Sequence, residues 1–269
     1  MNTFIFVFIF LLVNIIGSFL NVVIYRFNSG RSVGGRSSCM TCSTTLRWYE
    51  MIPVISFLFQ KGRCSTCSTK ISHQYPLVEF TTGIVFAILA FHFIPVLNFS
   101  ISAFVFLLTF FIFVFSLLIV IAVYDIRHKI IPDTLVYAFA FVSLSSVFIN
   151  TTGIGPLFIA PHMSVFSVGP LLAIPFALIW LISKGTLMGL GDAKLILGIG
   201  WLLGLSQGIA ALIISFWVGA VFGLLVLLFS HKKVGMKTEI PFAPFIILGT
   251  LIVFVSHINV FNLASLFVF

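Results

Sequence analysis

The sequence predicts an all-α protein that crosses a lipid bilayer about eight times and carries a small cytoplasmic zinc-binding lobe between its first two helices. Of its 269 residues, 61% are hydrophobic and 7% are charged, and the mean hydropathy is +1.26, which is far outside the range of soluble domains. In a soluble protein the net charge of +8 would suggest a nucleic-acid partner. Here the Lys and Arg residues fall in four clusters between apolar stretches, which indicates membrane topology and no nucleic-acid partner: residues 26–70, 127–129, 184–194 and 232–237.

The first apolar stretch forms the first of three predicted domains, residues 1–25. We expect a transmembrane helix over about residues 4–24, because this stretch is long enough to span and lacks the basic segment that begins a secretory signal. The first positive charge follows it, at Arg26, so its N-terminus is expected outside. Asn21 gives the helix a polar face, and we expect it to hydrogen-bond to a neighbouring helix.

The second predicted domain is the polar lobe of residues 26–76, which holds seven of the fourteen basic residues and all four cysteines. The positive-inside rule places this lobe in the cytoplasm. Two C-x-x-C pairs at this spacing favour one structural zinc ion with four thiolate ligands, since so small a lobe can bury little core and metal binding would fold it. The predicted metal ligands are Cys39, Cys42, Cys64 and Cys67.

Two other interpretations of the cysteines stay open at this point. They are disulfides, which a reducing cytosol disfavours, and a thiol redox couple, which needs an oxidising compartment or a thioredoxin-like frame. For the two acidic residues of this region we expect structural roles. Glu50 is expected to pair with a nearby arginine, and Glu79 to lie in the first turn of the second helix, where the helix dipole favours an anion.

The third predicted domain is a helical core over residues 77–269. Its apolar stretches predict seven further transmembrane helices, separated by loops that alternate between basic and uncharged, so that both termini lie outside. The expected helices cover about residues 77–96, 102–124, 132–149, 167–183, 192–204, 207–230 and 241–258.

Two aspartates lie in the short segment that follows the third expected helix. Asp133 comes after Pro132 at a helix start, where a capping or dipole role is sufficient explanation. Asp125 lies at a helix C-terminus, where the dipole opposes an anion, so it needs either a functional reason or a basic partner such as Arg127 or Lys129.

A third aspartate, Asp192, follows the sequence Gly189-Leu190-Gly191 at the boundary between two apolar stretches. It could cap a helix, but the flanking glycines let other backbone approach closely, and charged groups near a bilayer are costly unless they function. Asp125 and Asp192 are expected at the same membrane face. Two carboxylates in one site share a proton, and such a pair can activate water for peptide hydrolysis.

These motifs together resemble the type IV prepilin peptidases over most of the chain. The resemblance rests on the two C-x-x-C pairs, the Asp192 motif, the Asp125–Asp133 segment and the stretches 17–21, 46–53 and 71–79. It implies an aspartic protease of the bacterial inner membrane that removes the leader of prepilins and pseudopilins on the cytoplasmic side, with Asp125 and Asp192 as catalytic residues. It also implies the bifunctional form, which methylates the new N-terminal amine with S-adenosylmethionine.

Two other classes of function compete with this interpretation. An ion-coupled transporter could place Asp125, Asp192 and Lys194 on an ion path, although transporter carboxylates usually lie near the bilayer midplane rather than at helix ends. A membrane thiol redox protein could use the four cysteines, although their expected compartment is reducing.

Overall fold

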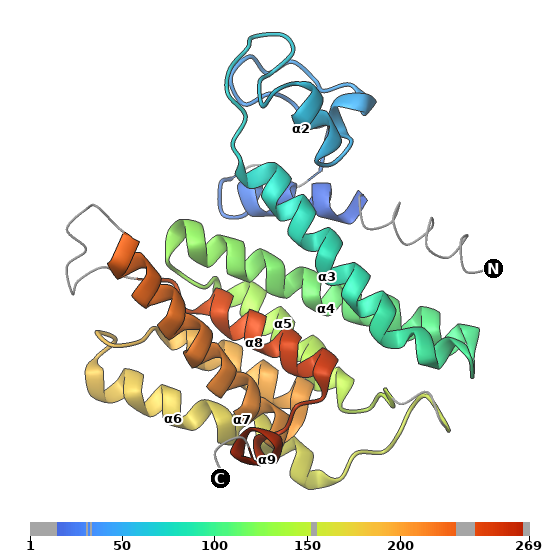
Figure 1. Ribbon diagram of the computed structural model, residues 1–269, viewed down its shortest axis with the longest axis vertical. Helices are drawn as coiled ribbons and strands as arrows, with labels where there is room; N and C mark the ends of the chain where they lie inside the picture. The colour runs from blue at the N-terminus through green and yellow to red at the C-terminus, as the bar shows by residue number, and fades with distance from the viewer. Residues whose placement is uncertain (1–14, 31, 33, 152–154, 230–239, 266–269) are drawn as a thin grey trace. The chain divides into compact units, whose positions relative to one another are not determined.

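The computed structural model describes residues 15–30, 32, 34–151, 155–229 and 240–265 (Figure 1). These residues form helices joined by short loops, together with isolated antiparallel bridges such as Ser38–Thr45 and Arg63–Lys70. The all-α prediction is therefore confirmed for the described chain. The expectations for the first fourteen residues and for the basic turn at 231–233 lie outside the described residues.

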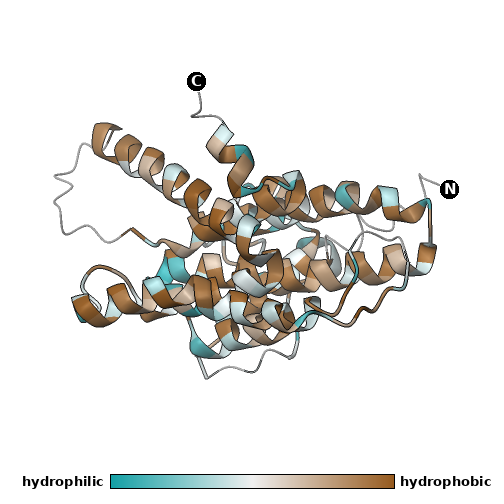
Figure 2. Cartoon of the chain, turned by 90° about the horizontal axis from the view of Figure 1, so that it is seen from below, coloured by the Kyte–Doolittle hydropathy of each residue, from teal (hydrophilic) through white to brown (hydrophobic). Residues whose placement is uncertain are grey.

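Four of the described helices are long and apolar enough to cross a membrane: Gln74–Leu97, Ile101–His128, Met163–Ser183 and Leu190–Phe229. Shorter apolar helices cover Ile15–Arg26, Asp133–Ser146 and Ala243–Ser256. Hydrophobic residues dominate these helices along their length (Figure 2). The structure thus supports a membrane protein, while the count of eight crossings stays a prediction.

The chain divides into two compact units, Met1–Ile94 and Pro95–Phe269. This division falls inside helix α3 (Gln74–Leu97), whereas the sequence suggested three parts with the core beginning at residue 77. The three-part division stays a prediction, and the two units are described separately below.

Unit 1 contains the helical segment Ile15–Arg26, the cysteine-containing lobe and α3 up to Ile94. The lobe has little regular structure beyond the short helices η1 (Trp48–Met51) and α2 (Ile55–Phe59). The buried side chain of Asn21 donates a hydrogen bond to the carbonyl of Tyr75 in the first turn of α3 at 3.1 Å, which confirms the expected helix–helix contact.

Unit 2 is a bundle of α4 (Ile101–His128), α5 (Asp133–Ser146), η2 (Met163–Ser167), α6 (Val168–Ser183), α7 (Leu190–Phe229), α8 (Ala243–Ser256) and α9 (Val260–Ser265). Helix α7 packs against α5, α6 and α8, and α8 also packs against α4. Aromatic rings fill the α4–α8 contact, where Phe254 lies 4.6 Å from Phe111 and 5.6 Å from Phe115 between ring centroids. The last turns of α4 meet the first residue of α8, and the candidate site lies there.

Helix α7 replaces two helices that the sequence predicted to be separated by a loop near residue 206. Forty continuous helical residues would extend about 60 Å, roughly twice the hydrocarbon thickness of a bilayer. The chain instead breaks at Gly204, whose φ of 78° and ψ of 176° are readily adopted by glycine. The expected loop is therefore reduced to a single-residue break, because one glycine is enough to redirect the chain.

The other predicted boundaries agree with the structure to within a few residues, with one difference near the site. Helix α4 was expected to end at residue 124, but it continues to His128 and ends at Lys129, which adopts the left-handed conformation with φ of 56°. Asp125 consequently lies inside the last turns of α4 rather than beyond its end. The helix also begins as a capped element, since the Ser100 hydroxyl accepts a hydrogen bond from the backbone N–H of Ala103.

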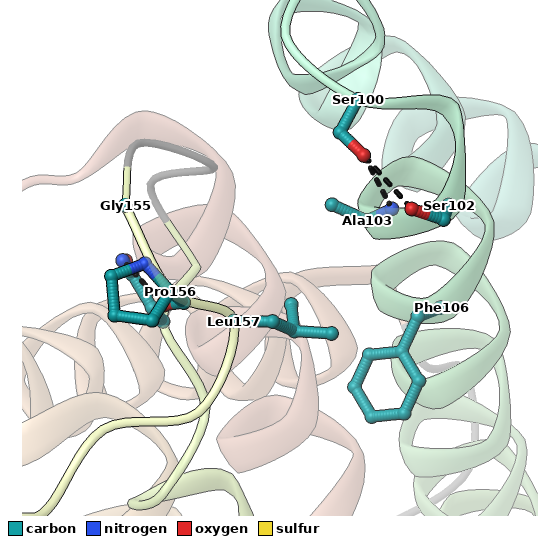
Figure 3. A pocket seen from close by; sticks show the side chains of 8 residues that line it. Ser100, Ser102, Ala103, Phe106, Gly155, Pro156 and Leu157 are labelled. Atoms are coloured by element: carbon teal, nitrogen blue, oxygen red, sulfur yellow. Dashed lines mark hydrogen bonds between the residues drawn. The ribbon is translucent and has the colours of Figure 1, made fainter.

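A cavity of about 450 Å³ lies beside the start of α4 (Figure 3). It is lined by Ser100, Ser102, Ala103 and Phe106 of that helix and by Asn150 and residues 155–157. Its two serine hydroxyls have no acidic or basic side chain beside them in this lining to activate them, so the cavity offers no catalytic pair. The candidate catalytic residues lie instead near the opposite end of α4.

Candidate active site and metal centre

Asp125 lies in the last turns of α4 and is 5% exposed. Its Oδ2 atom accepts a hydrogen bond of 3.2 Å from the backbone N–H of Ala243, the first residue of α8. The start of α8 carries partial positive charge and unsatisfied N–H groups, and its own N-cap residue, Phe242, provides no side-chain cap. The N-terminus of α8 therefore offsets the unfavourable dipole of α4 and holds the Asp125 carboxyl in place.

Asp192 is the third residue of α7 and is partly buried. Its backbone N–H donates to the carbonyl of Gly189 at 3.3 Å, so the glycine-rich turn leads directly into the helix. In this first turn the α7 dipole favours a negative charge, although Asp192 lies inside the helix and not at the cap position that the sequence left open.

Gly191 lets the first turn of α7 approach the segment between α4 and α5. A β-carbon placed on Gly191 would lie 2.8 Å from Cβ of Ile131 and 3.3 Å from two further atoms of that side chain. Carbon atoms prefer a separation of about 3.5–4.0 Å, so a residue larger than glycine would push α7 away from Ile131. The second glycine of the motif is thus required by packing between the two elements that carry the aspartates.

The structure brings Asp125 and Asp192 together in unit 2. The two carboxyl groups are close enough for the charge of Asp125 to act on Asp192. The sequence placed them at one membrane face from basic clusters alone. Helix α5 packs against both α4 and α7, and Gly191 lies against Ile131 in the segment between α4 and α5, which brings these distant parts of the chain near one another. Their catalytic assignment stays a proposal, which is developed below.

Asp133 and Lys194 form an ion pair beside this site. The Nζ atom of Lys194 donates to Oδ1 of Asp133 at 2.7 Å and lies 5.0 Å from the centroid of the Tyr137 ring. Asp133 lies in the first turn of α5, as expected, but the N-cap position belongs to Pro132. The carboxylate therefore ties α5 to the second turn of α7 as well as lying at a helix N-terminus.

Sequence reasoning named Arg127 and Lys129 as candidate partners of Asp125 and missed Ala243. Pro241 and Pro244 lie at the start of the helix expected over residues 241–258, so an N-terminus with unsatisfied N–H groups was foreseeable there. Nothing local indicated that this terminus packs against α4. The contact depends on tertiary packing between residues 118 positions apart.

The four cysteines of unit 1 form one cluster. Their sulfur atoms all lie within 4.8 Å of one another, with Cys39–Cys67 at 3.8 Å and Cys42–Cys64 at 4.0 Å. A tetrahedral zinc with bonds of about 2.3 Å places its sulfurs about 3.8 Å apart, whereas a disulfide needs about 2.05 Å. The cluster therefore has the dimensions of a closed four-thiolate metal site, and the cysteines are free.

Each C-x-x-C pair is held by the same turn. In the first pair the N–H of Cys39 donates to the carbonyl of Thr44 at 3.0 Å, and in the second the N–H of Cys64 donates to Thr69 at 2.9 Å. Ser43 and Ser68 both adopt φ of 57°, and an antiparallel bridge follows each turn. This repeat was missed in the sequence, although the pattern C-x-x-C-S-T occurs in both halves and would have revealed it.

The threonine that ends each turn also acts on the cysteine thiols. The Thr44 side chain lowers the pKa of Cys42 by hydrogen bonding, and Thr69 does the same for Cys67, whose sulfur lies 3.2 Å from the threonine hydroxyl. Hydrogen bonds to sulfur stabilise the thiolate form, which is the form that binds metal. The donor set thus fits a zinc ion in chemistry as well as in dimensions.

The two glutamates of unit 1 have structural roles that differ from the expected ones: Glu79 is the sixth residue of α3 and lies beyond its first turn, and Glu50 binds the backbone of an arginine rather than its guanidinium. Glu50 accepts the backbone N–H of Arg47 at 2.7 Å and also a hydrogen bond from the hydroxyl of Ser65. These bonds hold the pKa of Glu50 below its ordinary value. Glu79 accepts the N–H of Val54 at 2.8 Å, so this α3 side chain also fixes the lobe.

Comparison with known proteins identifies the family. Residues 11–93 match the Bacterial Peptidase A24 N-terminal domain, and residues 112–224 match the Type IV leader peptidase family. The chain belongs to the type IV leader peptidase family. The resemblance inferred from the motifs is therefore confirmed. Both Asp125 and Asp192 lie in the segment that matches the peptidase family.

Several curated relatives named prepilin leader peptidase/N-methyltransferase are similar to this chain. The Bacillus subtilis protein is 34% identical, with 82% of each chain covered. The Dichelobacter nodosus protein is 31% identical over 94% of this chain and 92% of its own, and the Stutzerimonas stutzeri protein is 31% identical over 86% and 84%. The expectations of peptidase and methyltransferase activity agree with these names. No solved structure matches this chain.

Proposed function

We propose that this chain is a membrane aspartic endopeptidase that removes the leader peptide from type IV prepilins and pseudopilins. Family membership supports the reaction class. The observation that carries the assignment to residues is that Asp125 lies near enough to Asp192 in unit 2 for its charge to act on the Asp192 carboxyl. No metal or organic cofactor is needed for this hydrolysis, because two carboxyl groups supply both the base and the acid.

Two carboxyl groups so close cannot both ionise cheaply, so one retains a proton while the other is charged. The charged group removes a proton from water as the water oxygen attacks the scissile carbonyl carbon. The protonated group donates a hydrogen bond to the developing oxyanion, which stabilises it. Collapse breaks the C–N bond, the leaving amine takes a proton from the carboxyl pair, and the products are a carboxylate and a free amine.

The neighbouring backbone positions this pair. The N–H of Ala243 restricts the orientation of Asp125, and the approach of Gly191 to Ile131 sets the position of Asp192 relative to α4 and α5. The Asp133–Lys194 ion pair lies outside the reacting groups, so it supports the arrangement without taking part in proton transfer.

The proposed location is the bacterial inner membrane, with the active site facing the cytoplasm. The basic cluster Arg127–Lys129 directly follows Asp125 in the chain, and the cluster of residues 184–194 contains Asp192. Both clusters favour the cytoplasmic side, because positively charged loops are retained there. On this assignment both aspartates lie beside basic clusters at the cytoplasmic face. Transporter carboxylates usually lie near the bilayer midplane, so this position also counts against an ion-coupled transporter.

The protein is further proposed to methylate the amine that cleavage exposes, with S-adenosylmethionine as donor. The names of the curated relatives support this second activity. The two activities require separate chemistry, because a carboxylate pair that hydrolyses peptides has no part in moving a methyl group from sulfur to nitrogen.

We also propose that Cys39, Cys42, Cys64 and Cys67 bind one structural zinc ion. The sulfur separations and the matched turns support this assignment. A closed site with four thiolates leaves no position for substrate, so the ion would stabilise the lobe and take no part in catalysis. A thiol redox function is disfavoured, because all four sulfurs form one cluster of metal-site dimensions.

Cleavage by purified protein tests the proposed function. Wild-type protein in detergent or liposomes is incubated with a synthetic prepilin, and mass spectrometry identifies the products. Cleavage at a single bond between leader and mature pilin is expected. An intact substrate would contradict the proposal and favour the transporter alternative, which a proton-flux assay on the same liposomes would then examine.

A further inference from the structure

The lobe of unit 1 contains a cavity that the peptidase mechanism does not use. It has a volume of about 610 Å³ and is lined by residues between Thr44 and Thr66. Binding sites for small molecules typically enclose about 300–1,000 Å³. The cavity is therefore large enough for a ligand of nucleoside size, and its lining indicates what kind of ligand it fits.

One wall of the cavity is apolar and open to solvent. Ile52, Ile55 and Phe59 line it, and the Phe59 side chain is 85% exposed. Exposed aliphatic and aromatic side chains beside a cavity offer a surface against which a planar heterocycle can stack. This wall fits a nucleobase.

The rest of the lining carries opposite charges. The Glu50 carboxylate is held by the N–H of Arg47 and by the Ser65 hydroxyl, as described above. The Arg47 guanidinium donates to the Tyr49 hydroxyl at 2.7 Å and lies 6.0 Å from the centroid of that ring. A carboxylate suits hydroxyl donors or a positive centre, and a guanidinium suits a ligand carboxylate.

We propose that this cavity binds the methyl donor, a nucleoside sulfonium that also carries an amino-acid group. The inference rests on the methyltransferase part of the proposed function. The base packs on Ile52, Ile55 and Phe59, Glu50 accepts hydrogen bonds from the ribose hydroxyls, and Arg47 binds the ligand carboxylate. Tyr49 lies beside the sulfonium, where an aromatic face attracts a cation.

The methyl transfer itself needs no further reactant. The unprotonated amine of the cleaved pilin attacks the methyl carbon of the donor, and the N–C bond forms as the C–S bond breaks. The bonding electron pair remains on sulfur, which becomes a neutral thioether. The methylated ammonium then returns its extra proton to water.

The two sides of the cavity are fixed by groups that do not line it. The cysteine turns hold Thr44, Ser65 and Thr66, which are part of the lining. On the other side, Glu79 holds the N–H of Val54, a β-branched residue with φ of 60° that starts α2. Non-glycine residues adopt this conformation at a cost, so the contact with Glu79 maintains the course of the apolar wall. On this proposal the four-cysteine cluster also fixes the shape of the cavity that binds the methyl donor.

The test measures binding of S-adenosylhomocysteine, the thioether product, to full-length zinc-loaded protein by calorimetry. The principal variant is Glu50→Gln, because the glutamine amide oxygen can still accept the Arg47 N–H and its amide N–H can donate to the Ser65 hydroxyl, while the charge is lost. Arg63→Gln is the matched control, since it removes a charge from the same lobe but lies outside the cavity lining. We expect binding at least ten-fold weaker for Glu50→Gln and unchanged for Arg63→Gln.

Loss of bound zinc in Glu50→Gln would show that the substitution disturbs the lobe. A second variant and a crosslinking experiment test the inference in that case. Phe59→Ala should also weaken analogue binding, and ultraviolet crosslinking of labelled donor should map to peptides within residues 44–66. Wild-type protein that transfers methyl groups while both variants bind normally, or while the label maps elsewhere, would overturn the inference and leave the proposed function intact. Wild-type protein that neither binds nor transfers would overturn the methyltransferase proposal with it, and prepilin cleavage would still be judged separately.

Discussion

Gly191 offers a direct test of the packing that positions Asp192. In a Gly191→Ala variant the new β-carbon lies 2.8 Å from Cβ of Ile131, whereas such carbon pairs need about 3.5–4.0 Å. The first turn of α7 must therefore move by about 1 Å. A displacement of this size in an active site costs about 100-fold in rate, and overpacking costs about 1–3 kcal/mol of stability. We expect Gly191→Ala to cleave prepilin about 100-fold more slowly while still inserting into the membrane.

The assay compares initial cleavage rates and thermal unfolding in detergent. Gly223→Ala is the matched control on the same helix, because its new β-carbon would approach no atom closer than 3.9 Å. Combining Gly191→Ala with Ile131→Gly removes the clashing side chain and should recover part of the lost rate, since the two residues are in contact. Wild-type activity and stability in Gly191→Ala would refute the reasoning.

The remaining predictions concern the metal, the ion pair, the second activity and the topology. Cys42→Ser should lower bound zinc, measured by metal analysis, and make the lobe more sensitive to protease; near-zero zinc in wild type would exclude the site. Asp133→Asn should retain at least roughly a fifth of the cleavage rate, because an exposed ion pair contributes about 0–1 kcal/mol; complete loss would place this carboxylate in the chemistry. Asp192→Asn should still methylate a pre-cleaved pilin, as measured with labelled donor, and failure to do so would show that the two activities share a site. Accessibility tags at residue 98 should react from outside and tags at residue 187 from inside; the reverse result at 187 would put Asp192 on the wrong face.

The helices were predictable because the sequence alternates long apolar stretches with short basic segments. The boundaries of α3, α5 and α6 follow from this alternation to within a few residues. The end of α4 and the break at Gly204 were less predictable, since one polar residue in an apolar helix, or one glycine between two apolar stretches, does not specify where hydrogen bonding stops.

The site was predictable in its residues and not in its supporting contacts. Asp125 and Asp192 were identified because charged groups near a bilayer are costly and are kept there mainly for function. The cysteines were identified because their spacing matches metal sites. The bond from Ala243 and the contact between Gly191 and Ile131 join segments far apart in the chain. Local sequence patterns carry no information about such pairs, so these contacts required the fold.

The central claim is that Asp125 and Asp192 form the proteolytic pair, and rates of prepilin cleavage by single variants test it most directly. Purified wild-type, Asp125→Asn, Asp192→Asn and Asp133→Asn proteins are compared under single-turnover conditions, with membrane insertion checked for each. Loss of an acid–base group lowers the rate about 10²–10⁴-fold. The cleavage rates of Asp125→Asn and Asp192→Asn should therefore each fall at least about 100-fold, while the rate of Asp133→Asn stays close to that of wild type. Cleavage by Asp125→Asn or Asp192→Asn within ten-fold of the wild-type rate would contradict the account.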